Sequence, residues 1–461
     1  MENLRINYSK FVLPNGIKCI LYNREEIHSV TVRVNVNVGA LDETATTTGL
    51  SHFIEHVAAG DGTKDLPTWE ALDKFKNDHS GSSNAYTTYD HTQYYGTFPY
   101  QYLKEALFYF SQQVLHPLIR TEDVEKERTI ILDEMRRYDD DIYHNVYKNI
   151  KENRFQTKKT QFSYDIIGTK KRLAAYTREN LRNFYEDYYI PENIEVYIVG
   201  NIDEEEAKKY LEEYFYKDIK NRRSGRSKER EFKEKYPDYS KFNISAVQKL
   251  DIDQYYLSIN FPSPEFSLRK AEDRFRVDFL AAITASGQYS QSVLWKKLRE
   301  ELNLVYGISA FTYDYLYSRN FFTIFTSFNK ENLSTILKEV YNGVNQIKYG
   351  KITESIFKSR QKKLIDTQLM QLDKPANVLN WITSSEDELE AHEKEITIPY
   401  FLNYIENETF ENIIEIGKEI FDWSKVNIGL VSKDSKKDAE LLLRSEWEKI
   451  ALAEDQIKLI K

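Results

Sequence analysis

One combination of elements occurs twice in the chain, far apart in the sequence: a helix, a turn and an apolar strand. The first copy covers residues 178–200 and the second covers residues 413–432, so equivalent positions such as Val199 and Val431 are 232 residues apart. A repeat of whole supersecondary units predicts an internal duplication, with two α/β halves of about 220 residues each.

A second pair of strands supports the same duplication. Residues 30–38 alternate apolar and polar side chains over nine positions, which predicts a strand with one face on a core, and residues 255–261 could be its counterpart. We therefore predict a first half at residues 1–216 and a second half at residues 241–461. The charged segment 217–240 between them has few aliphatic residues and is interpreted as a linker.

Composition limits the class of protein further. The 461 residues are enough for two or three domains, and the net charge of −9 argues against nucleic-acid binding and favours cationic ligands or peptides. The single cysteine, Cys19, excludes an internal disulfide and suits a reducing compartment. We find no run of eighteen apolar residues and no leader sequence near Met1, so we expect a cytoplasmic protein without a membrane span.

The strongest chemical signal is His-x-x-Glu-His, formed by His52, Glu55 and His56. Residues four apart lie one turn above each other on a helix, so both imidazoles can face one metal ion. Glu55 is offset by one position, which makes it a poor third ligand but a good proton acceptor for a water molecule at the metal. Thr48 and Ser51 offer hydroxyl oxygens to cap such a helix at its N-terminus.

A non-functional interpretation remains open for the motif alone: a surface helix with two solvated histidines and a glutamate. The distribution of histidines bears on where metal chemistry would lie, because only His392 belongs to the second half. The other seven are His28, His52, His56, His79, His91, His116 and His144. Any metal site is therefore expected in the first half.

Two carboxylates further along share one helical face. Glu127 and Glu134 are seven residues apart, with Ile130 and Ile131 between them on the same face. A carboxylate on an apolar stripe needs a partner, because burying an unpaired charge is costly, and a metal held by two histidines would be one. The alternative is that Glu134 pairs with a neighbouring arginine on a solvated face.

Taken together, ordered segments from about residue 10 to residue 435 resemble the pitrilysin and mitochondrial processing peptidase family of zinc peptidases, the inverzincins. Besides the motif, the matching segments are Leu13-Pro14-Asn15-Gly16, Gly39-Ala40-Leu41-Asp42-Glu43, Asn84-Ala85-x-Thr87, His116-Pro117-Leu118, Glu127-Arg128, Leu132-Asp133-Glu134, Tyr188-Tyr189-Ile190-Pro191-Glu192-Asn193 and Leu298-Arg299-Glu300-Glu301-Leu302-Asn303-Leu304-Val305-Tyr306. The tail at residues 436–461 looks helical and lies outside the resemblance.

The resemblance implies roles for individual residues. It implies zinc ligands at His52, His56 and Glu134, and a general base at Glu55. Glu127 matches a carboxylate that orients a ligand histidine.

From the second half, Arg299 and Tyr306 match residues that bind substrate and stabilise the oxyanion. Substrate would add as a strand along an edge containing Asn84, Ala85 and Thr87.

The resemblance also implies the fold, the activity and the assembly. The fold would be α+β: two homologous α/β halves, each an antiparallel-rich sheet with helices on one face, forming a clamshell. The activity would be zinc-dependent hydrolysis of unstructured peptides or leader segments, by a homodimer or by a heterodimer with a related chain. Around residues 57–63 the sequence departs from the family pattern, because small residues replace larger apolar ones. The alternative function is a non-catalytic peptide-binding or scaffold subunit.

Overall fold

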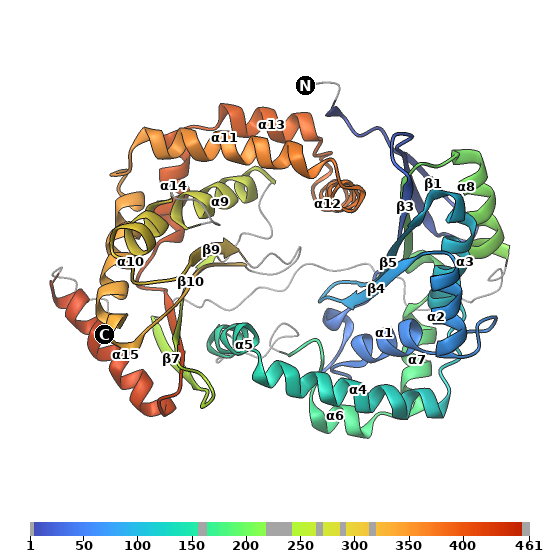
Figure 1. The fold of residues 1–461 in the computed structure, drawn as a ribbon, viewed down its shortest axis with the longest axis horizontal. Helices are drawn as coiled ribbons and strands as arrows, with labels where there is room; N and C mark the ends of the chain where they lie inside the picture. The colour runs from blue at the N-terminus through green and yellow to red at the C-terminus, as the bar shows by residue number, and fades with distance from the viewer. Residues whose placement is uncertain are drawn as a thin grey trace. The chain divides into compact units, whose positions relative to one another are not determined.

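The described residues of the chain fold into two compact units, each built on one β-sheet (Figure 1). The computed structural model describes residues 4–154, 164–217, 242–263, 271–285, 292–312 and 320–453. The linker expected at residues 217–240 lies, apart from Lys217, outside these ranges.

The first sheet has six strands in the order β1-β2-β6-β3-β5-β4. Their bounds are β1 Ser9–Val12, β2 Lys18–Asn23, β3 Ser29–Val36, β4 Ser82–Thr87, β5 Thr92–Pro99 and β6 Ile194–Gly200. Only β2 and β6 are parallel neighbours, and every other adjacent pair is antiparallel. Strand β4 pairs with β5 alone and is therefore an edge of the sheet.

The second sheet has five strands in the order β7-β11-β8-β10-β9. Their bounds are β7 Asn243–Gln248, β8 Tyr255–Ser263, β9 Ile308–Thr312, β10 Asn320–Phe328 and β11 Asn427–Ser432. Again one pair, β7 and β11, is parallel and the others are antiparallel.

The two strand orders confirm the duplication. Strands β7-β11-β8-β10-β9 follow the same order and directions as β2-β6-β3-β5-β4. Strand β6 corresponds to β11, and β3 to β8, which are the two pairs that the sequence predicted. The antiparallel-rich sheets and the α+β class are confirmed with them.

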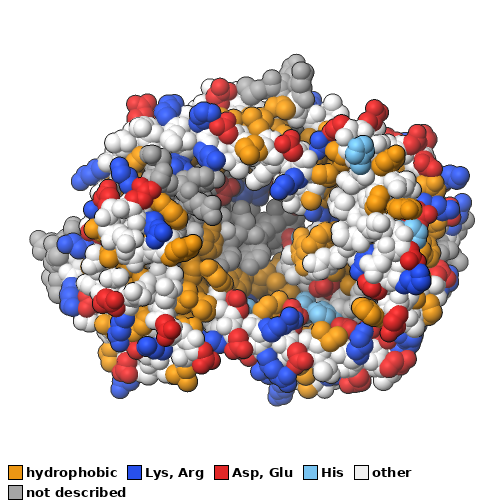
Figure 2. Space-filling model, in the orientation of Figure 1, with side chains coloured by type: hydrophobic (Ala, Val, Ile, Leu, Met, Phe, Trp, Pro, Cys, Tyr) orange, Lys and Arg blue, Asp and Glu red, His pale blue; other side chains and the backbone are white. Residues whose placement is uncertain are grey.

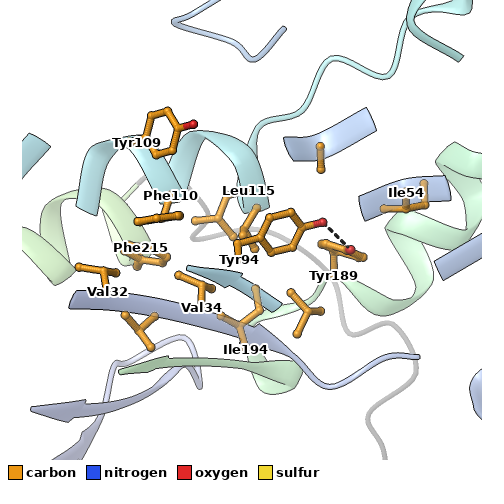
Figure 3. Packing of buried hydrophobic residues seen from close by; sticks show 14 of the residues in the cluster. Val32, Val34, Ile54, Tyr94, Tyr109, Phe110, Leu115, Tyr189, Ile194 and Phe215 are labelled. Atoms are coloured by element: carbon orange, nitrogen blue, oxygen red, sulfur yellow. Dashed lines mark hydrogen bonds between the residues drawn. The ribbon is translucent and has the colours of Figure 1, made fainter. Parts of the chain in front are cut away.

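Helices cover one face of the first sheet, where the larger core lies. Alternate residues of β3, among them Val32 and Val34, pack against α3 (Leu103–Leu115) because successive side chains of a strand point to opposite faces. In this core the hydroxyl groups of Tyr94 and Tyr189 are hydrogen-bonded at 2.9 Å, which satisfies two polar groups that are otherwise surrounded by apolar side chains (Figure 3).

The opposite face of each sheet is covered by a helix from the other half of the sequence, which was not predicted. Helix α12 (Pro375–His392) packs Val378, Leu379 and Ile382 against Ile20, Tyr197 and Val199 of the first sheet. Helix α5 (Ile142–Arg154) packs Val146 and Ile150 against Phe321, Phe325 and Val431 of the second sheet. The compact units therefore exchange segments: Gln371–Asp387 belongs to the first and Tyr138–Lys159 to the second.

The remaining α-helices complete the two units. They are α1 Leu50–Gly60, α2 Trp69–Asp78, α4 Thr121–Asp140, α6 Lys170–Ala175, α7 Arg178–Tyr188, α8 Glu204–Leu211, α9 Ala271–Thr284, α10 Leu333–Lys348, α11 Glu354–Gln371, α13 Ile398–Asn407, α14 Phe410–Ile420 and α15 Lys436–Ala453. The last of these confirms the helical tail for residues 436–453, with Trp447 buried in the second core, and the remaining tail residues 454–461 lie outside the described ranges.

The surface agrees with a modest net charge. Basic and acidic side chains are interspersed on the face shown in Figure 2. Within the described ranges, no helix is both long enough and apolar enough to cross a membrane.

Candidate metal centre

Helix α1 carries the His-x-x-Glu-His motif and begins in a way that the sequence did not reveal. Its N-cap residue is Gly49, which has a positive φ of 89° and offers no side-chain oxygen. The Glu43 carboxylate accepts hydrogen bonds from the backbone N–H groups of Gly49 and Ser51, both at 2.8 Å. The expected caps, Thr48 and Ser51, were therefore wrong, because a buried carboxylate from the preceding loop binds the first N–H groups instead.

Three of the predicted residues come together between α1 and α4. The Glu134 Oε2 atom lies 3.2 Å from His56 Nε2 and 3.7 Å from His52 Nε2. The two imidazole rings are 4.6 Å apart between centroids, and one potential ligand atom from each of the three residues lies within 4.8 Å of the others. The helical spacing of the histidines thus aims both rings at the glutamate.

Burial removes the interpretation of the motif as a solvated helix, and the position of Glu134 favours the histidines over a solvated ion pair. His52 is only 8% exposed, so the motif is not a solvated surface helix. Glu134 faces the histidines, whereas the neighbouring Arg136 pairs with Asp133.

The three side chains fit a zinc ion by chemistry and by spacing. Two imidazoles and one carboxylate form a ligand set of the kind found in catalytic zinc sites, where a fourth position stays open. Tetrahedral zinc with bonds of about 2.0–2.1 Å places its ligand atoms roughly 3.3 Å apart. The distances of 3.2 and 3.7 Å from Glu134 to the histidines agree with that spacing.

Glu55 lies beside this group and is held by a hydrogen bond. Its Oε2 atom accepts from Thr87 Oγ1 at 2.9 Å and lies 4.0 Å from His52 Nε2. Burial raises the pKa of the Glu55 carboxyl to about 7, although the positive charge of His56 and the hydrogen bond from Thr87 oppose the shift. A carboxyl group with a pKa near neutrality can both accept and return a proton.

The two histidines differ in their surroundings. Burial lowers the pKa of His52 to about 3. Burial also acts against protonation of His56, but hydrogen bonds to Glu127 and Glu134 outweigh it and raise the pKa of His56 to about 10. The Glu127 Oε2 atom lies 3.1 Å from His56 Nδ1, which leaves Nε2 as the nitrogen directed at Glu134.

A cavity of about 260 Å³ opens next to Glu55 and His56. Trp69 and Leu72 of α2 line it on one side, and Ser83 and Ala85 of the edge strand β4 line it on another. Polar groups in its wall bind each other: Tyr109 Oη lies 3.1 Å from Ser83 Oγ, for example. Charged side chains also line it, among them Asp73 and Lys76, which form an ion pair at 2.8 Å, so the cavity beside the metal centre is of mixed polar and apolar character.

The predicted substrate residues lie on β4, with two different environments. Thr87 is buried against Glu55, whereas Asn84 is exposed and Ala85 is half-buried. The Ala85 N–H donates to the Asn84 side-chain oxygen at 2.9 Å. This strand can accept another strand along its free edge.

Arg299 and Tyr306 belong to the second unit and form a pair there. Arg299 lies in a π-helical segment, Trp295–Glu301, and its Nη1 atom donates to the carbonyl of Val305 at 3.1 Å. Its guanidinium group lies 5.1 Å from the ring centre of Tyr306, which is 81% exposed. The tyrosine hydroxyl is therefore available to a ligand.

A fold of two duplicated α/β units, with an inverted His-x-x-Glu-His centre in the first, defines a class of metallopeptidase-like proteins. Two sequence profiles make the class specific. Residues 18–169 match the profile described as insulinase (peptidase family M16), and residues 175–364 match the profile described as peptidase M16 inactive domain. The chain belongs to peptidase family M16, which confirms the resemblance to the pitrilysin family.

Individual relatives are distant in sequence and close in fold. An uncharacterized zinc protease of Rickettsia bellii is 26% identical over 368 residues, covering 80% of this chain and 85% of that protein. A protease from Helicobacter pylori has a similar structure, with a TM-score of 0.78 at 18% identity over 93% of this chain and 100% of that one. A peptidase M16 inactive domain from Pseudomonas fluorescens gives a TM-score of 0.77 at 13% identity over 93% of this chain and 98% of that one. The two structures confirm the fold.

Proposed function

We propose that the protein is a zinc-dependent endopeptidase that hydrolyses unstructured peptides or leader segments. The observation that carries the proposal is the convergence of His52, His56 and Glu134 beside a buried Glu55. Membership of family M16 and the resemblance to relatives named zinc proteases support it.

The residues of the centre would divide the chemistry as follows. His52, His56 and Glu134 would hold the zinc ion, which would supply polarisation of the scissile carbonyl and lower the pKa of a water molecule. Glu55 accepts a proton from the attacking water and returns it to the leaving amine.

Thr87 and Glu127 keep this arrangement in place. The Thr87 hydroxyl fixes one oxygen of Glu55, while Glu127 binds His56 Nδ1 and so presents Nε2 to the metal.

The geometry of β4 supports an extended peptide as substrate. A peptide strand added along its free edge would place alternate side chains on the face of Ser83 and Ala85, next to the cavity. Trp69 and Leu72 offer apolar surface to a substrate side chain there, while Asp73 and Lys76 offer charged groups. Arg299 and Tyr306 would bind the substrate and donate to the developing oxyanion.

The quaternary state belongs to the same proposal. We expect a homodimer or a heterodimer with a related chain, and the cytoplasm as the location. Light scattering on fully active protein tests the first part, and a monomer of full activity would refute it.

Zinc content tests the proposal most directly. We expect about one zinc ion per chain in the wild type and almost none in Glu134→Gln, because the variant loses the charged ligand. Glu125→Gln is the matched control, since Glu125 lies on the same helix and pairs with Arg128 instead. Absence of zinc from the wild type, even after reconstitution, would contradict the proposal and favour the peptide-binding subunit.

A further inference from the structure

The carboxylate that binds His56 is itself held by a lysine that has no assigned role. The Lys126 Nζ atom lies 3.3 Å from Glu127 Oε1, while the other oxygen of Glu127 contacts His56 Nδ1. Among the residues that the structure describes, each oxygen of this carboxylate has one partner, and the two contacts favour a single orientation of the carboxylate.

Lys126 also reaches the end of the helix that carries both histidines. Its Nζ atom donates to Asp61 Oδ1 at 2.6 Å and lies 3.5 Å from the carbonyl of Gly60, the last residue of α1. A cation at the C-terminal end of a helix is favourable because it balances the helix dipole. One side chain of α4 thus spans the gap to α1, and these two helices carry all three proposed ligands.

The contacts of Lys126 differ from an ordinary surface ion pair because both of its carboxylate partners are buried. The side chains of Glu127 and Asp61 are only 5% and 4% exposed, whereas that of Lys126 is 46% exposed. Two buried carboxylates repel each other and are costly without a cation, and Lys126 is the one that the described residues place against both. Without Lys126 the charge of Glu127 would have His56 as its remaining close partner.

We propose that Lys126 is a positioning residue for the metal centre: it fixes the Glu127 carboxylate against His56. The proposal rests on the zinc site of the proposed function. Lys126 does not touch the metal or the substrate, and it acts through Glu127. Loss of Lys126 should therefore weaken zinc binding, with the loss of activity following from it.

The test compares zinc affinity in three variants, measured by competition with a chromophoric chelator. We expect Lys126→Met to bind zinc about ten-fold more weakly than the wild type, the lower end of what loss of an outer partner of a metal ligand costs. Lys126→Arg should restore most of the affinity. Asp61→Asn should keep it, because Lys126 still binds Glu127 and one repelling charge is gone.

A matched lysine separates a local effect from general destabilisation. Lys18 bonds the buried Glu195 at 3.2 Å and is similarly exposed, but it lies in β2 and is not part of the metal centre. Lys18→Met should leave zinc affinity unchanged, and thermal unfolding of the metal-free proteins should be compared for both variants. The absorption spectrum of the cobalt-substituted proteins should change in Lys126→Met alone.

The outcomes are distinguishable. Zinc binding by Lys126→Met equal to the wild type would overturn the inference and leave the proposed function intact. Equal losses in Lys126→Met and Asp61→Asn would also overturn it, because the effect would then come from the end of α1 and not from Glu127. A wild-type protein that binds no zinc would overturn both.

Discussion

The two units share a strand order but differ in chemistry. In the first, the helix after β3 is α1, with two histidines and a glutamate facing α4. In the second, the helix after β8 is α9, which lacks histidine and buries Val277, Phe279, Leu280 and Ile283. The duplicated fold therefore depends on the apolar pattern that both halves retain, whereas the metal centre depends on a few residues that only the first half has.

The two units are more alike in the helices that cover the second face of their sheets. Each sheet binds one helix from the opposite half of the sequence, α12 on the first and α5 on the second. A half without the other's helix would expose the apolar patch beneath it, so neither half is complete in its own sequence. The halves thus differ in their metal-site residues, which only the first half has, and resemble each other in that each covers one sheet of the other. Both features can be tested.

The largest expected effect is on the rate of peptide cleavage at the metal centre, which only the first half has. Glu55→Gln should lower kcat for peptide cleavage about a thousand-fold, because the neutral amide cannot accept the proton of the attacking water. Zinc content should stay at the wild-type level. Asp278→Asn, in the matching helix α9, is the control and should cleave normally. Undiminished cleavage by Glu55→Gln would show that the base lies elsewhere.

The second largest effect is expected on stability, because each sheet is covered by a helix from the other half of the sequence. Leu379→Ala should lower the free energy of unfolding by about 3 kcal/mol, because Leu379 is fully buried between α12 and the first sheet. Ile150→Ala, the equivalent change between α5 and the second sheet, should cost a similar amount. Urea unfolding measures both, with Leu369→Ala as an exposed control. If Leu379→Ala unfolded at the same urea concentration as the wild type, α12 would not be needed to cover the sheet.

A smaller effect would show that the second half takes part in the reaction. Tyr306→Phe should lower kcat about 100-fold with zinc content unchanged, if its exposed hydroxyl donates to the oxyanion. Tyr349→Phe, another exposed tyrosine of the second unit, is the control. An increase in KM alone would assign Tyr306 to substrate binding and not to the oxyanion.

The smallest effect concerns the carboxylate at the start of α1. Burial raises the pKa of Glu43 from 4.5 to about 7, against the opposing hydrogen bonds from Ser51 and Gly49. The folded state then holds a proton that the unfolded state has lost, so the stability contributed by this group falls as the pH rises from about 4.5 to about 7. Glu43→Gln should remove this part of the pH dependence, measured by urea unfolding across that range. An unchanged pH profile would contradict the prediction.

Much of the site was predictable because it depends on local spacing. His52 and His56 share a helical face by their positions alone, and Glu127 and Glu134 do so in α4. What brings the two helices together is tertiary structure, and the spacing alone left a solvated arrangement open. The capping role of Glu43 and the contacts of Lys126 could not be read from the sequence, because their partners are fixed only when loop and helix pack.

The sequence by itself determined the duplication, through two pairs of corresponding strands, and the shared helical faces of His52 with His56 and of Glu127 with Glu134, because periodicity and residue spacing do not depend on knowledge of contacts. The assignment of Glu134 as a zinc ligand came from the family resemblance. Tertiary structure alone decided which helix covers which sheet. Helices α5 and α12 each present a few apolar residues to the sheet that they cover, and the pattern of a helix does not say which apolar surface it will bury. That choice depends on the path of the chain and on the complementary surfaces of Val378, Leu379 and Ile382.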